Sequence, residues 1–431
     1  MRILQVNKFY YPKGGADKYF LNLTKALNAT GHETAVFAMA DPRNLESPYS
    51  KYFAAQVEFN GGGLKDKLKI PGRMIYSRTA RRKFARELDD FKPDIVHVHN
   101  IYHQLSPSIL EAAKARGIPV VMHLHDYKLI CPNYRLFTKG HICRKCLDEK
   151  NYLPCLANNC YESYLQSFLA TLEMTIHHKW LHIYEKNINL LIAPSEFMRR
   201  LMIESGWPEE KIITVYNPAP KISEALLNTE DGLLKNDYQN NYQNDYPEED
   251  YLLYFGRLEP EKGISDLAQA VKSGGGHSGQ KLHIVGEGPE EKNIRTKFGS
   301  EIKNGQIKLL GQLSGQSLNA EITKARAVVF PSIWPENMPL ALLESLAQGK
   351  IIIASRVGGL PEIIKDKENG FLFKAGDIKE LEAVIKAVRE LKPEAKRNIE
   401  LRARESARIL DPDNHLVKIL KIYSKLAKKS G

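Results

Sequence analysis

Short apolar segments typical of buried strands alternate with helix-like segments along both halves of this 431-residue chain. Because such alternation builds parallel sheets covered by helices, it predicts an α/β fold. The strand candidates are centred on Val96, Val120–Val121, Ile192, Ile284, Val328–Val329 and Ile351–Ile353. A chain of this length exceeds the usual size of one hydrophobic core, so we expect two α/β domains.

A polar segment marks the boundary between the two domains. Residues 236–246 consist of Asn, Asp, Gln and Tyr, a composition that cannot bury a core and is typical of an inserted loop. The predicted divisions are an N-terminal domain over 1–217, a linker over 218–250, a C-terminal domain over 251–411 and a last helix over 412–431.

Two cations follow a strand-like run at the start of the second domain. The run over residues 251–255 ends at Gly256, and Arg257 and Lys262 lie in the loop beyond it, before a helix-like segment that starts after Gly263. In open α/β sheets, ligands bind beyond the carboxyl ends of the strands. A guanidinium and an ammonium beside a helix start suit a diphosphate, although two solvated cations on a loop are the alternative.

Two carboxylates form the second candidate site. Glu336 and Glu344 are eight positions apart, just over two helical turns, so a helix over this segment would place both on one face. Glu336 follows Pro335, where we expect the helix to begin. Carboxylates bind hydroxyl groups, and the free amides of a helix start bind anions. The alternative is an ordinary amphipathic helix that buries Leu340, Leu343 and Leu346.

Together these segments resemble glycosyltransferase family 4. The resemblance extends over nearly the whole chain, in the order of the family's motifs. Its motifs are Gly14-Gly15-Ala16, Pro93–His99, His125-Asp126, Gly256–Gly263, Val285–Pro289, the Glu336/Glu344 pair, Val357–Pro361 and Asn369–Phe373. The resemblance implies the GT-B fold, in which two doubly wound, Rossmann-like domains face one another across a cleft and the final helix packs back on the first domain.

The resemblance also implies an activity. The chain is similar to enzymes that move a sugar from a UDP- or GDP-sugar donor to a glycan or lipid-linked acceptor, as in polysaccharide biosynthesis. The resemblance implies transfer with retention of the anomeric configuration and without a catalytic metal or other cofactor. A nucleotide-sugar epimerase of the same fold and a non-catalytic subunit that binds nucleotide sugars are the alternatives.

Roles for individual residues follow from the same resemblance. Arg257 and Lys262 would stabilise the departing diphosphate, Glu336 would bind hydroxyls of the donor sugar, and Glu344 would bind the ribose. The segment comprising Met338, Pro339 and Leu340 would bind the donor phosphates through its backbone.

In the first domain, Gly14 and Gly15 would approach the donor phosphates, because glycines let the backbone come close to a ligand. His125 would contact the donor sugar, and His99 is a candidate on the acceptor side. A buried structural histidine is the alternative for His125. The family often has Glu two residues after the glycines, where this chain has Asp17.

All five cysteines lie between positions 131 and 160. The last four are Cys143, Cys146, Cys155 and Cys160, and the first two of these have the spacing of a zinc knuckle. A structural zinc site formed by these four is one interpretation; reduced or redox-labile thiols and disulfides are the others.

The net charge of +11 is concentrated in part over residues 65–86, which contain nine Lys or Arg, one acid and several apolar side chains. Such a segment suits an anionic membrane surface or a charged acceptor, and a solvated basic face is the alternative. No motif for nucleic-acid recognition accompanies the charge. Residues 1–6 are interpreted as a strand rather than a signal peptide, and no apolar run reaches 18 residues. We therefore expect a cytoplasmic enzyme at the inner face of the membrane.

Overall fold

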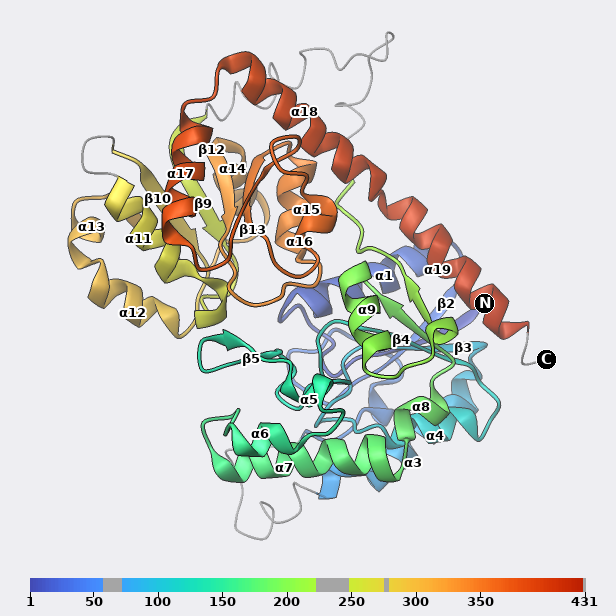
Figure 1. Cartoon of the computed structure of the whole chain (residues 1–431). Helices are drawn as coiled ribbons and strands as arrows, with labels where there is room; N and C mark the ends of the chain where they lie inside the picture. Colours follow the sequence, from blue (N-terminus) through green and yellow to red (C-terminus); the bar gives the residue numbers. More distant parts are fainter. Residues whose placement is uncertain (57–71, 222–247, 275–278, 429–431) are drawn as a thin grey trace. The chain divides into compact units, whose positions relative to one another are not determined.

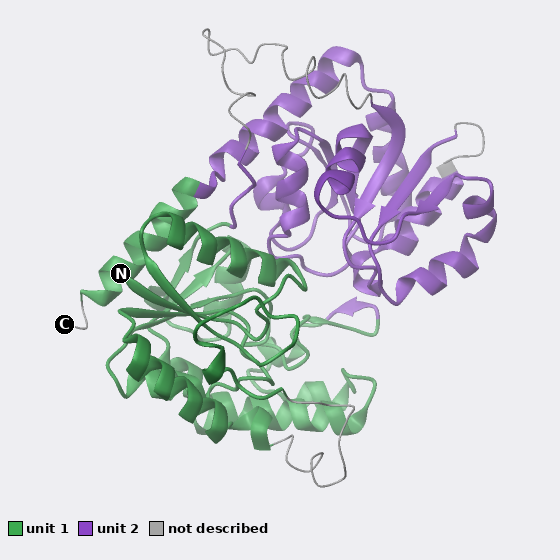
Figure 2. Cartoon of the chain, turned by 180° about the vertical axis from the view of Figure 1, so that it is seen from behind, with its two compact units in different colours: residues 1–139, 143–216, 413–431 green, residues 140–142, 217–412 purple. Residues whose placement is uncertain are grey.

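The computed structural model describes residues 1–56, 72–221, 248–274 and 279–428 (Figure 1). The polar segment 236–246 and residues 65–71 of the basic segment lie outside these ranges. The chain divides into two compact units, coloured separately in Figure 2. Unit 1 comprises Met1–Lys139, Cys143–Tyr216 and Asp413–Gly431, and unit 2 comprises Gly140–Ile142 and Asn217–Pro412.

Unit 1 is built on a six-stranded sheet in the order β2-β1-β3-β4-β7-β8, with every neighbouring pair parallel. In chain order its strands are β1 (Arg2–Val6), β2 (Glu33–Phe37), β3 (Ile95–Val98), β4 (Val120–His123), β7 (Leu190–Ala193) and β8 (Ile212–Thr214). The strands expected around Val96, Val120–Val121 and Ile192 are confirmed.

Helices connect these strands. They are α1 (Gly15–Ala29), α3 (Arg78–Phe91), α4 (Ser108–Lys114), α8 (Ile183–Asn187) and α9 (Glu196–Glu204), with short 3₁₀ turns η1 (Ser50–Tyr52) and η3 (Glu209–Lys211). The last helix, α19 (Pro412–Ala427), contributes Tyr423 and His415 to unit 1, where the Tyr423 hydroxyl lies 2.6 Å from His97 Nδ1 and the Tyr19 hydroxyl lies 2.8 Å from His415 Nε2.

An insertion separates β4 from β7. It contains the two-stranded sheet β5 (Phe137–Thr138) with β6 (His141–Ile142), then α5 (Lys145–Asp148), α6 (Leu153–Ala157), α7 (Tyr164–Thr175), the π-helical turn η2 (Ile176–Trp180) and, after it, α8. The cysteines belong to this insertion and to the loop that leads into it.

Unit 2 has a second six-stranded parallel sheet, in the order β11-β10-β9-β12-β13-β14. Its strands are β9 (Glu249–Phe255), β10 (Lys281–Val285), β11 (Ile307–Leu309), β12 (Ala325–Phe330), β13 (Ile351–Ser355) and β14 (Phe371–Phe373). The strands expected around Ile284, Val328–Val329 and Ile351–Ile353 are confirmed. The first strand begins at Glu249, two residues before the expected start of the domain.

The helices of unit 2 pack around a core that includes Leu252, Ile284, Val329 and Ile353. They are η5 (Pro260–Lys262), α11 (Ile264–Gly274), α12 (Glu290–Lys297), α13 (Gly299–Lys303), α14 (Gly315–Lys324), α15 (Leu340–Ala347), α16 (Leu360–Ile363), α17 (Ile378–Arg389) and α18 (Pro393–Ile409). Two parallel α/β sheets are thus present, as predicted.

One predicted element is wrong in its extent. The helix that carries Glu344 begins at Leu340 rather than after Pro335, so Glu336 lies in the loop before it. Proline disfavours helical geometry in the residue before it, and Pro339 occupies the N-cap position with an extended backbone. Glu336 and Glu344 therefore do not share a helical face.

Candidate functional site

The centre of the candidate site in unit 2 is an ion pair between two loops. Lys262 ends η5, after β9, and Glu336 follows β12; these two strands are neighbours in the sheet. Lys262 Nζ lies 2.5 Å from Glu336 Oε1, and the two side chains are only 15% and 8% exposed. The carboxyl ends of adjacent parallel strands thus bring together two residues that are 74 positions apart.

Glu336 is held as a charged group. Its Oε1 also accepts a hydrogen bond from the Ser332 hydroxyl at 2.6 Å. Burial alone would raise the pKa of the Glu336 carboxyl, but the Lys262 ammonium, the hydrogen bond from Ser332 and the polar side chain of Trp334 lower it below its ordinary value. The Lys262 ammonium also lies over the Trp334 ring, 5.1 Å from its centroid.

The loops that carry this pair touch through their backbones. Gly263 has a φ of +68°, and a Cβ there would lie 2.0 Å from the Pro331 carbonyl oxygen. Gly358 has a φ of +59°, and a Cβ there would lie 1.9 Å from the Glu336 carbonyl oxygen, which also accepts a hydrogen bond from the Gly359 amide. Only glycine permits these approaches, which fix the backbone on either side of Glu336.

Arg257 differs from Lys262 in its surroundings. Its side chain is 63% exposed, and its Nη1 lies 3.7 Å from Glu259 Oε1. Its backbone is fixed, because its carbonyl accepts a hydrogen bond from the Tyr254 hydroxyl at 2.8 Å. The loop therefore presents one largely buried, paired cation, Lys262, and one largely exposed cation, Arg257.

The residues expected to bind the donor lie around α15. Glu344 is half-buried within the helix, and Leu340 begins it. Pro339 is the N-cap, and the buried Met338 precedes it, with its carbonyl accepting a hydrogen bond from Asn217 Nδ2 at 3.1 Å. The α15 amides at Leu340 and Ala341 are at the helix start, where an anion is stabilised.

In unit 1, the two candidate histidines contact each other. His99 follows β3 and His125 follows β4, and Nδ1 of His99 lies 2.9 Å from Nε2 of His125. His99 is fully buried, and its Nε2 lies 3.0 Å from Gln5 Oε1. Burial lowers the pKa of His125 to about 3, so its imidazole is neutral at pH 7. The contact between His99 and His125 suits a positioning role for His99, and its role on the acceptor side stays a prediction.

The glycine pair lies at the start of α1. Gly14 is its N-cap with an extended backbone, and Gly15 is its first residue. A Cβ at Gly15 would meet nothing within 4 Å, so unit 1 itself does not demand glycine there. Asp17 is buried, and its Oδ1 accepts a hydrogen bond from Asn7 Nδ2 at 2.8 Å. Asp17 therefore holds the loop after β1.

The cysteines are all free thiols. Cys131 donates to Asn133 Oδ1 at 2.9 Å, and burial raises its pKa to about 11. The Cys155 thiol beside it lowers the pKa of Cys160 below its ordinary value. Among the described residues, no group of three or more His, Cys, Asp or Glu side chains is arranged to hold a metal ion. The zinc site of Cys143, Cys146, Cys155 and Cys160 stays a prediction.

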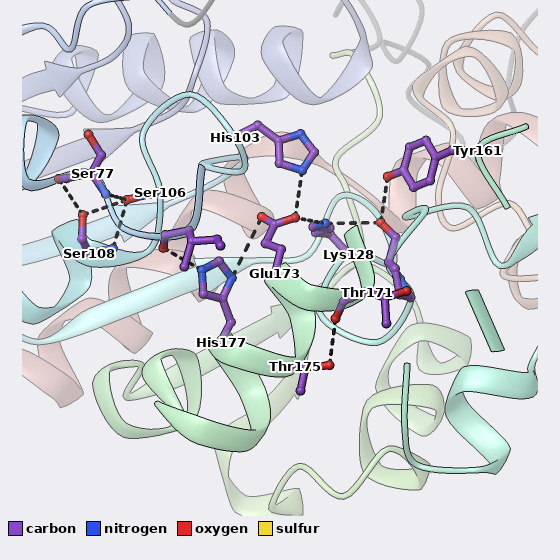
Figure 3. A network of polar contacts seen from close by, with 12 residues as sticks. Ser77, His103, Ser106, Ser108, Lys128, Tyr161, Thr171, Glu173, Thr175 and His177 are labelled. Atoms are coloured by element: carbon purple, nitrogen blue, oxygen red, sulfur yellow. Dashed lines mark hydrogen bonds and ion pairs between the residues drawn. The ribbon is translucent and has the colours of Figure 1, made fainter. Parts of the chain in front are cut away.

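Sequence reasoning missed two groups of residues. Ser332 and Trp334 support Glu336, and their position just beyond a strand and before Glu336 was the available signal. The second group lies in unit 1, where Lys128 Nζ donates to Glu173 Oε2 at 2.8 Å between two buried side chains (Figure 3). No local pattern links Lys128 to Glu173, because α7 and the loop after β4 meet only in the folded unit.

Two family profiles match the chain. Residues 13–220 match "Glycosyltransferase Family 4", and residues 237–406 match "Glycosyl transferases group 1". An uncharacterised 42.6 kDa protein in the cps region of Klebsiella pneumoniae is 24% identical over 403 residues, which is 89% of this chain and 92% of that protein. A phosphatidyl-myo-inositol mannosyltransferase of Mycolicibacterium smegmatis is 22% identical over 382 residues, 88% of this chain and 81% of that protein.

Solved structures share the fold. The Anabaena protein Alr3699/HepE in complex with UDP aligns with a TM-score of 0.66 at 17% identity, covering 99% of this chain and 100% of that one. Sucrose-phosphate synthase from Thermosynechococcus elongatus aligns with a TM-score of 0.70 at 16% identity, covering 99% of each chain. Both units therefore have the architecture of GT-B glycosyltransferases.

Proposed function

This chain belongs to glycosyltransferase family 4, and from that premise we propose that it transfers a sugar, with retention of configuration, from a nucleoside-diphosphate sugar to a glycan acceptor. The observation that carries the proposal is the buried Lys262–Glu336 pair at the carboxyl ends of β9 and β12. It combines a cation for phosphate with a carboxylate for sugar hydroxyls.

The cations supply the catalytic charge in this proposal. When the bond between the anomeric carbon and the diphosphate oxygen breaks, the diphosphate gains negative charge that must be stabilised. A cation about 4 Å from one extra unit charge gains roughly 4 kcal/mol at an effective dielectric near 20. That stabilisation is worth on the order of a thousandfold in rate. Lys262 and Arg257 fill this role, so we propose that the transfer needs no catalytic metal.

Glu336 binds rather than attacks. Its Oε1 is engaged by Lys262 and Ser332, which supports a role as an oriented acceptor for hydroxyls of the donor sugar. The acceptor oxygen would then attack on the face from which the diphosphate leaves. The acceptor's proton would pass to the departing diphosphate oxygen. Product stereochemistry by NMR tests this step, and an inverted linkage would contradict it.

The nucleotide is assigned by analogy with the relatives. Structures of Alr3699/HepE contain UDP and UDP-glucose. We propose a UDP- or GDP-sugar donor whose ribose is bound by Glu344 and whose phosphates are bound by the backbone at Met338–Leu340. In unit 1, Gly14 and Gly15 would face the phosphates and His125 would contact the sugar.

The acceptor is proposed as a chemical class. A relative lies in a cps region, and another is a mannosyltransferase of a phosphatidyl-inositol lipid. These relatives support a lipid-linked or polysaccharide acceptor. For the location we propose a cytoplasmic enzyme whose basic residues contact the anionic inner face of the membrane. We also propose that Cys143, Cys146, Cys155 and Cys160 bind a structural zinc ion. Metal analysis of the purified protein tests this proposal, and absence of stoichiometric zinc would contradict it.

Incubation of labelled UDP- and GDP-sugars with and without candidate acceptors tests the function. A transferase extends the acceptor and releases the nucleoside diphosphate. An epimerase instead yields an isomerised sugar without acceptor, and a binding subunit shows a thermal shift with nucleotide but no turnover. The last two outcomes would each replace the proposal with one of its alternatives.

A further inference from the structure

The helical stretch formed by α7 and η2 exposes its apolar face to the solvent. Tyr164, Leu165, Phe168 and Trp180 are 69%, 68%, 47% and 67% exposed. These positions, with the half-buried Leu169, Leu172 and Ile176 between them, follow the spacing of a single helical stripe. Surface helices of globular proteins normally turn such a stripe toward the core, so this one needs a different partner.

The buried face of the same stretch is largely polar. It carries Ser167, Thr171, Glu173, His177 and His178. Glu173 Oε2 accepts from Lys128 and lies 3.2 Å from His103 Nε2, and His177 lies beside it (Figure 3). Burial would raise the pKa of Glu173, but Lys128, His103 and His177 lower it, so the carboxylate stays charged. This network fixes the orientation of α7, so the apolar stripe cannot rotate inward without uncovering a buried ion pair.

A basic stretch adjoins the helical stretch formed by α7 and η2. Nε2 of His177 in η2 lies 2.7 Å from the Ile75 carbonyl oxygen, which joins η2 to the segment that leads into α3. Residues 72–86 hold six Lys or Arg and no acid, and Arg78, Arg81, Arg82 and Arg86 are exposed. Figure 1 shows α7 and α3 along the same edge of unit 1.

We propose that the α7–η2 stripe, with the basic stretch of α3 beside it, is the surface by which this chain docks on an anionic lipid bilayer. The apolar stripe would enter the boundary between headgroups and acyl chains, and the arginines would bind acidic headgroups. Tyr164 and Trp180 stand at the two ends of the stripe, where amphipathic aromatic rings suit the interface. This inference gives a location to the membrane contact proposed above.

The dimensions fit a helix that lies on the membrane. From Tyr164 to Trp180 the stripe measures about 24 Å at 1.5 Å per residue. Within the residues that the structure describes, none of the helices is both long and apolar enough to cross a bilayer. A partly embedded helix with basic neighbours is the arrangement expected of a peripheral contact.

Charge also separates a bilayer from a second copy of the chain. A symmetric dimer through this stripe would bring two basic stretches toward each other, in a protein that already carries a net charge of +11. Like charges destabilise such an interface, whereas acidic headgroups neutralise them. The charge pattern therefore favours the anionic surface.

Cosedimentation of the full chain with vesicles tests the docking surface without requiring transfer activity. The wild type should bind phosphatidylcholine vesicles containing about one-third phosphatidylglycerol and should be left in solution by phosphatidylcholine alone. The double variant Leu165→Ser/Phe168→Ser should bind on the order of tenfold more weakly or worse, because two inserted apolar side chains are lost. The double variant Leu45→Ser/Ile409→Ser removes equally exposed apolar groups elsewhere and should bind as wild type does.

Charge-reversal variants test the basic stretch in the same cosedimentation experiment. Arg78→Glu/Arg82→Glu should weaken binding on the order of a hundredfold, and Lys303→Glu/Lys308→Glu in unit 2, with the same charge change, should have little effect. Circular dichroism and thermal unfolding establish that each variant is folded. Trp180 fluorescence should shift to the blue on anionic vesicles, and Trp180→Phe should abolish that shift while leaving cosedimentation measurable.

Three results would overturn the proposal. One is wild-type protein that stays in solution with anionic vesicles, and another is equal binding to neutral vesicles. The third is a dimer in analytical ultracentrifugation that Leu165→Ser/Phe168→Ser disperses, which would assign the stripe to a second copy. Because none of these readouts depends on nucleotide or acceptor, they can fail while the glycosyltransferase function holds, and the reverse is equally true.

Discussion

The two units hold their candidate site residues in opposite electrostatic states. In unit 2, Lys262 and Glu336 are both charged and pair at 2.5 Å in a largely buried setting. In unit 1, His99 and His125 lie 2.9 Å apart, and burial holds their pKa values so low that both are neutral at pH 7. Buried charge gives strong stabilisation of a developing charge, whereas neutral imidazoles offer hydrogen bonds and shape.

The backbones differ in the same sense. The loops around Glu336 close on each other at Gly263 and Gly358, where a Cβ would collide with a carbonyl oxygen. The start of α1 at Gly14 and Gly15 is open, with room for a Cβ at both. The loop backbone around Glu336 in unit 2 is thus fixed by close contacts, whereas the start of α1 in unit 1 leaves space for a side chain. We therefore expect the largest losses of activity from substitutions in unit 2.

The largest expected effect is the loss of a cation in unit 2. Arg257→Ala should reduce kcat/KM on the order of a thousandfold, because one charge near the diphosphate is removed. Its side chain is 63% exposed, so the unfolding free energy should hardly change. Lys262→Ala should reduce activity as strongly but also destabilise unit 2, because Glu336 would be left buried without its counter-ion.

Steady-state kinetics with the true donor and acceptor, paired with denaturant unfolding, check both variants. Turnover near that of the wild type in both would remove the assigned roles. Equal stability of Lys262→Ala and wild type would show that the Lys262–Glu336 pair does not hold the loops together.

The next effect concerns the backbone contrast. Gly263→Ala should destabilise unit 2 by roughly 2–4 kcal/mol, because a positive φ and a contact with the Pro331 carbonyl both oppose a side chain. Gly15→Ala should change stability by less than about 1 kcal/mol, since the site is helical and open. Chemical denaturation measures both. A stable Gly263→Ala protein, or an unstable Gly15→Ala protein, would break the comparison.

Much of this arrangement was accessible from the sequence, and the rest depended on long-range packing. Strand positions such as those around Val96, Val120–Val121 and Ile284 were predicted because buried parallel strands are short apolar runs. The placement of Arg257 and Lys262 after a strand also followed from local pattern. Glu336 was wrongly placed in a helix, because the eight-residue spacing was given more weight than Pro339.

Local sequence pattern did not show how deeply a residue is buried or which distant residue it contacts. Alternation along a strand puts His97 and His99 on one face of the sheet. It does not show that His99 is fully buried, because that burial depends on α1 and α19 covering the face. Likewise, a helical stripe from Tyr164 onward is visible in the sequence. Only the fold shows that its polar face points inward and contacts Lys128.

We expect acid to destabilise unit 1 at a higher pH than unit 2. Burial lowers the pKa of His97 and His125 to about 3 and of His177 and His415 to about 4, all in unit 1. An unfolded histidine titrates near 6.5, so between about pH 6.5 and 4 the unfolded chain binds more protons than the folded one. Stability is therefore lost as the pH falls through this window, by up to about 1.4 kcal/mol per pH unit for each group.

Unit 2 should lose stability only at a lower pH than unit 1. The folded pKa of Glu336 is lowered, so its contribution is present above its unfolded value near 4.5 and is lost only as the pH falls below it. Hydrogen exchange between pH 6.5 and 5, corrected for the intrinsic pH dependence, should show protection falling in β3 and β4 before β9 and β12. Simultaneous loss in both sheets would contradict this order.

One group in unit 1 opposes the histidines and offers a matched control. Burial raises the pKa of Glu87 in α3 to about 9, so its unfolded form is ionised while its folded form is neutral between about pH 4.5 and 9. That difference makes stability rise as the pH falls, opposite in sign to the histidines. Glu87→Gln should therefore steepen the acid loss of protection in unit 1, and an unchanged slope would count against a neutral Glu87.

The smallest expected effect tests how the unit 1 histidines work. His125→Ala removes the proposed sugar contact, and His99→Asn removes only the group that orients it, through the 2.9 Å contact. Because a partner that orients a binding group contributes less than the group itself, His99→Asn should lower kcat/KM by roughly tenfold or less. His125→Ala should lower it more, yet less than Arg257→Ala. If His99→Asn were as damaging as His125→Ala while remaining folded, the buried imidazole would have to act on substrate directly, and the contrast between a charged and a neutral set of site residues would fail.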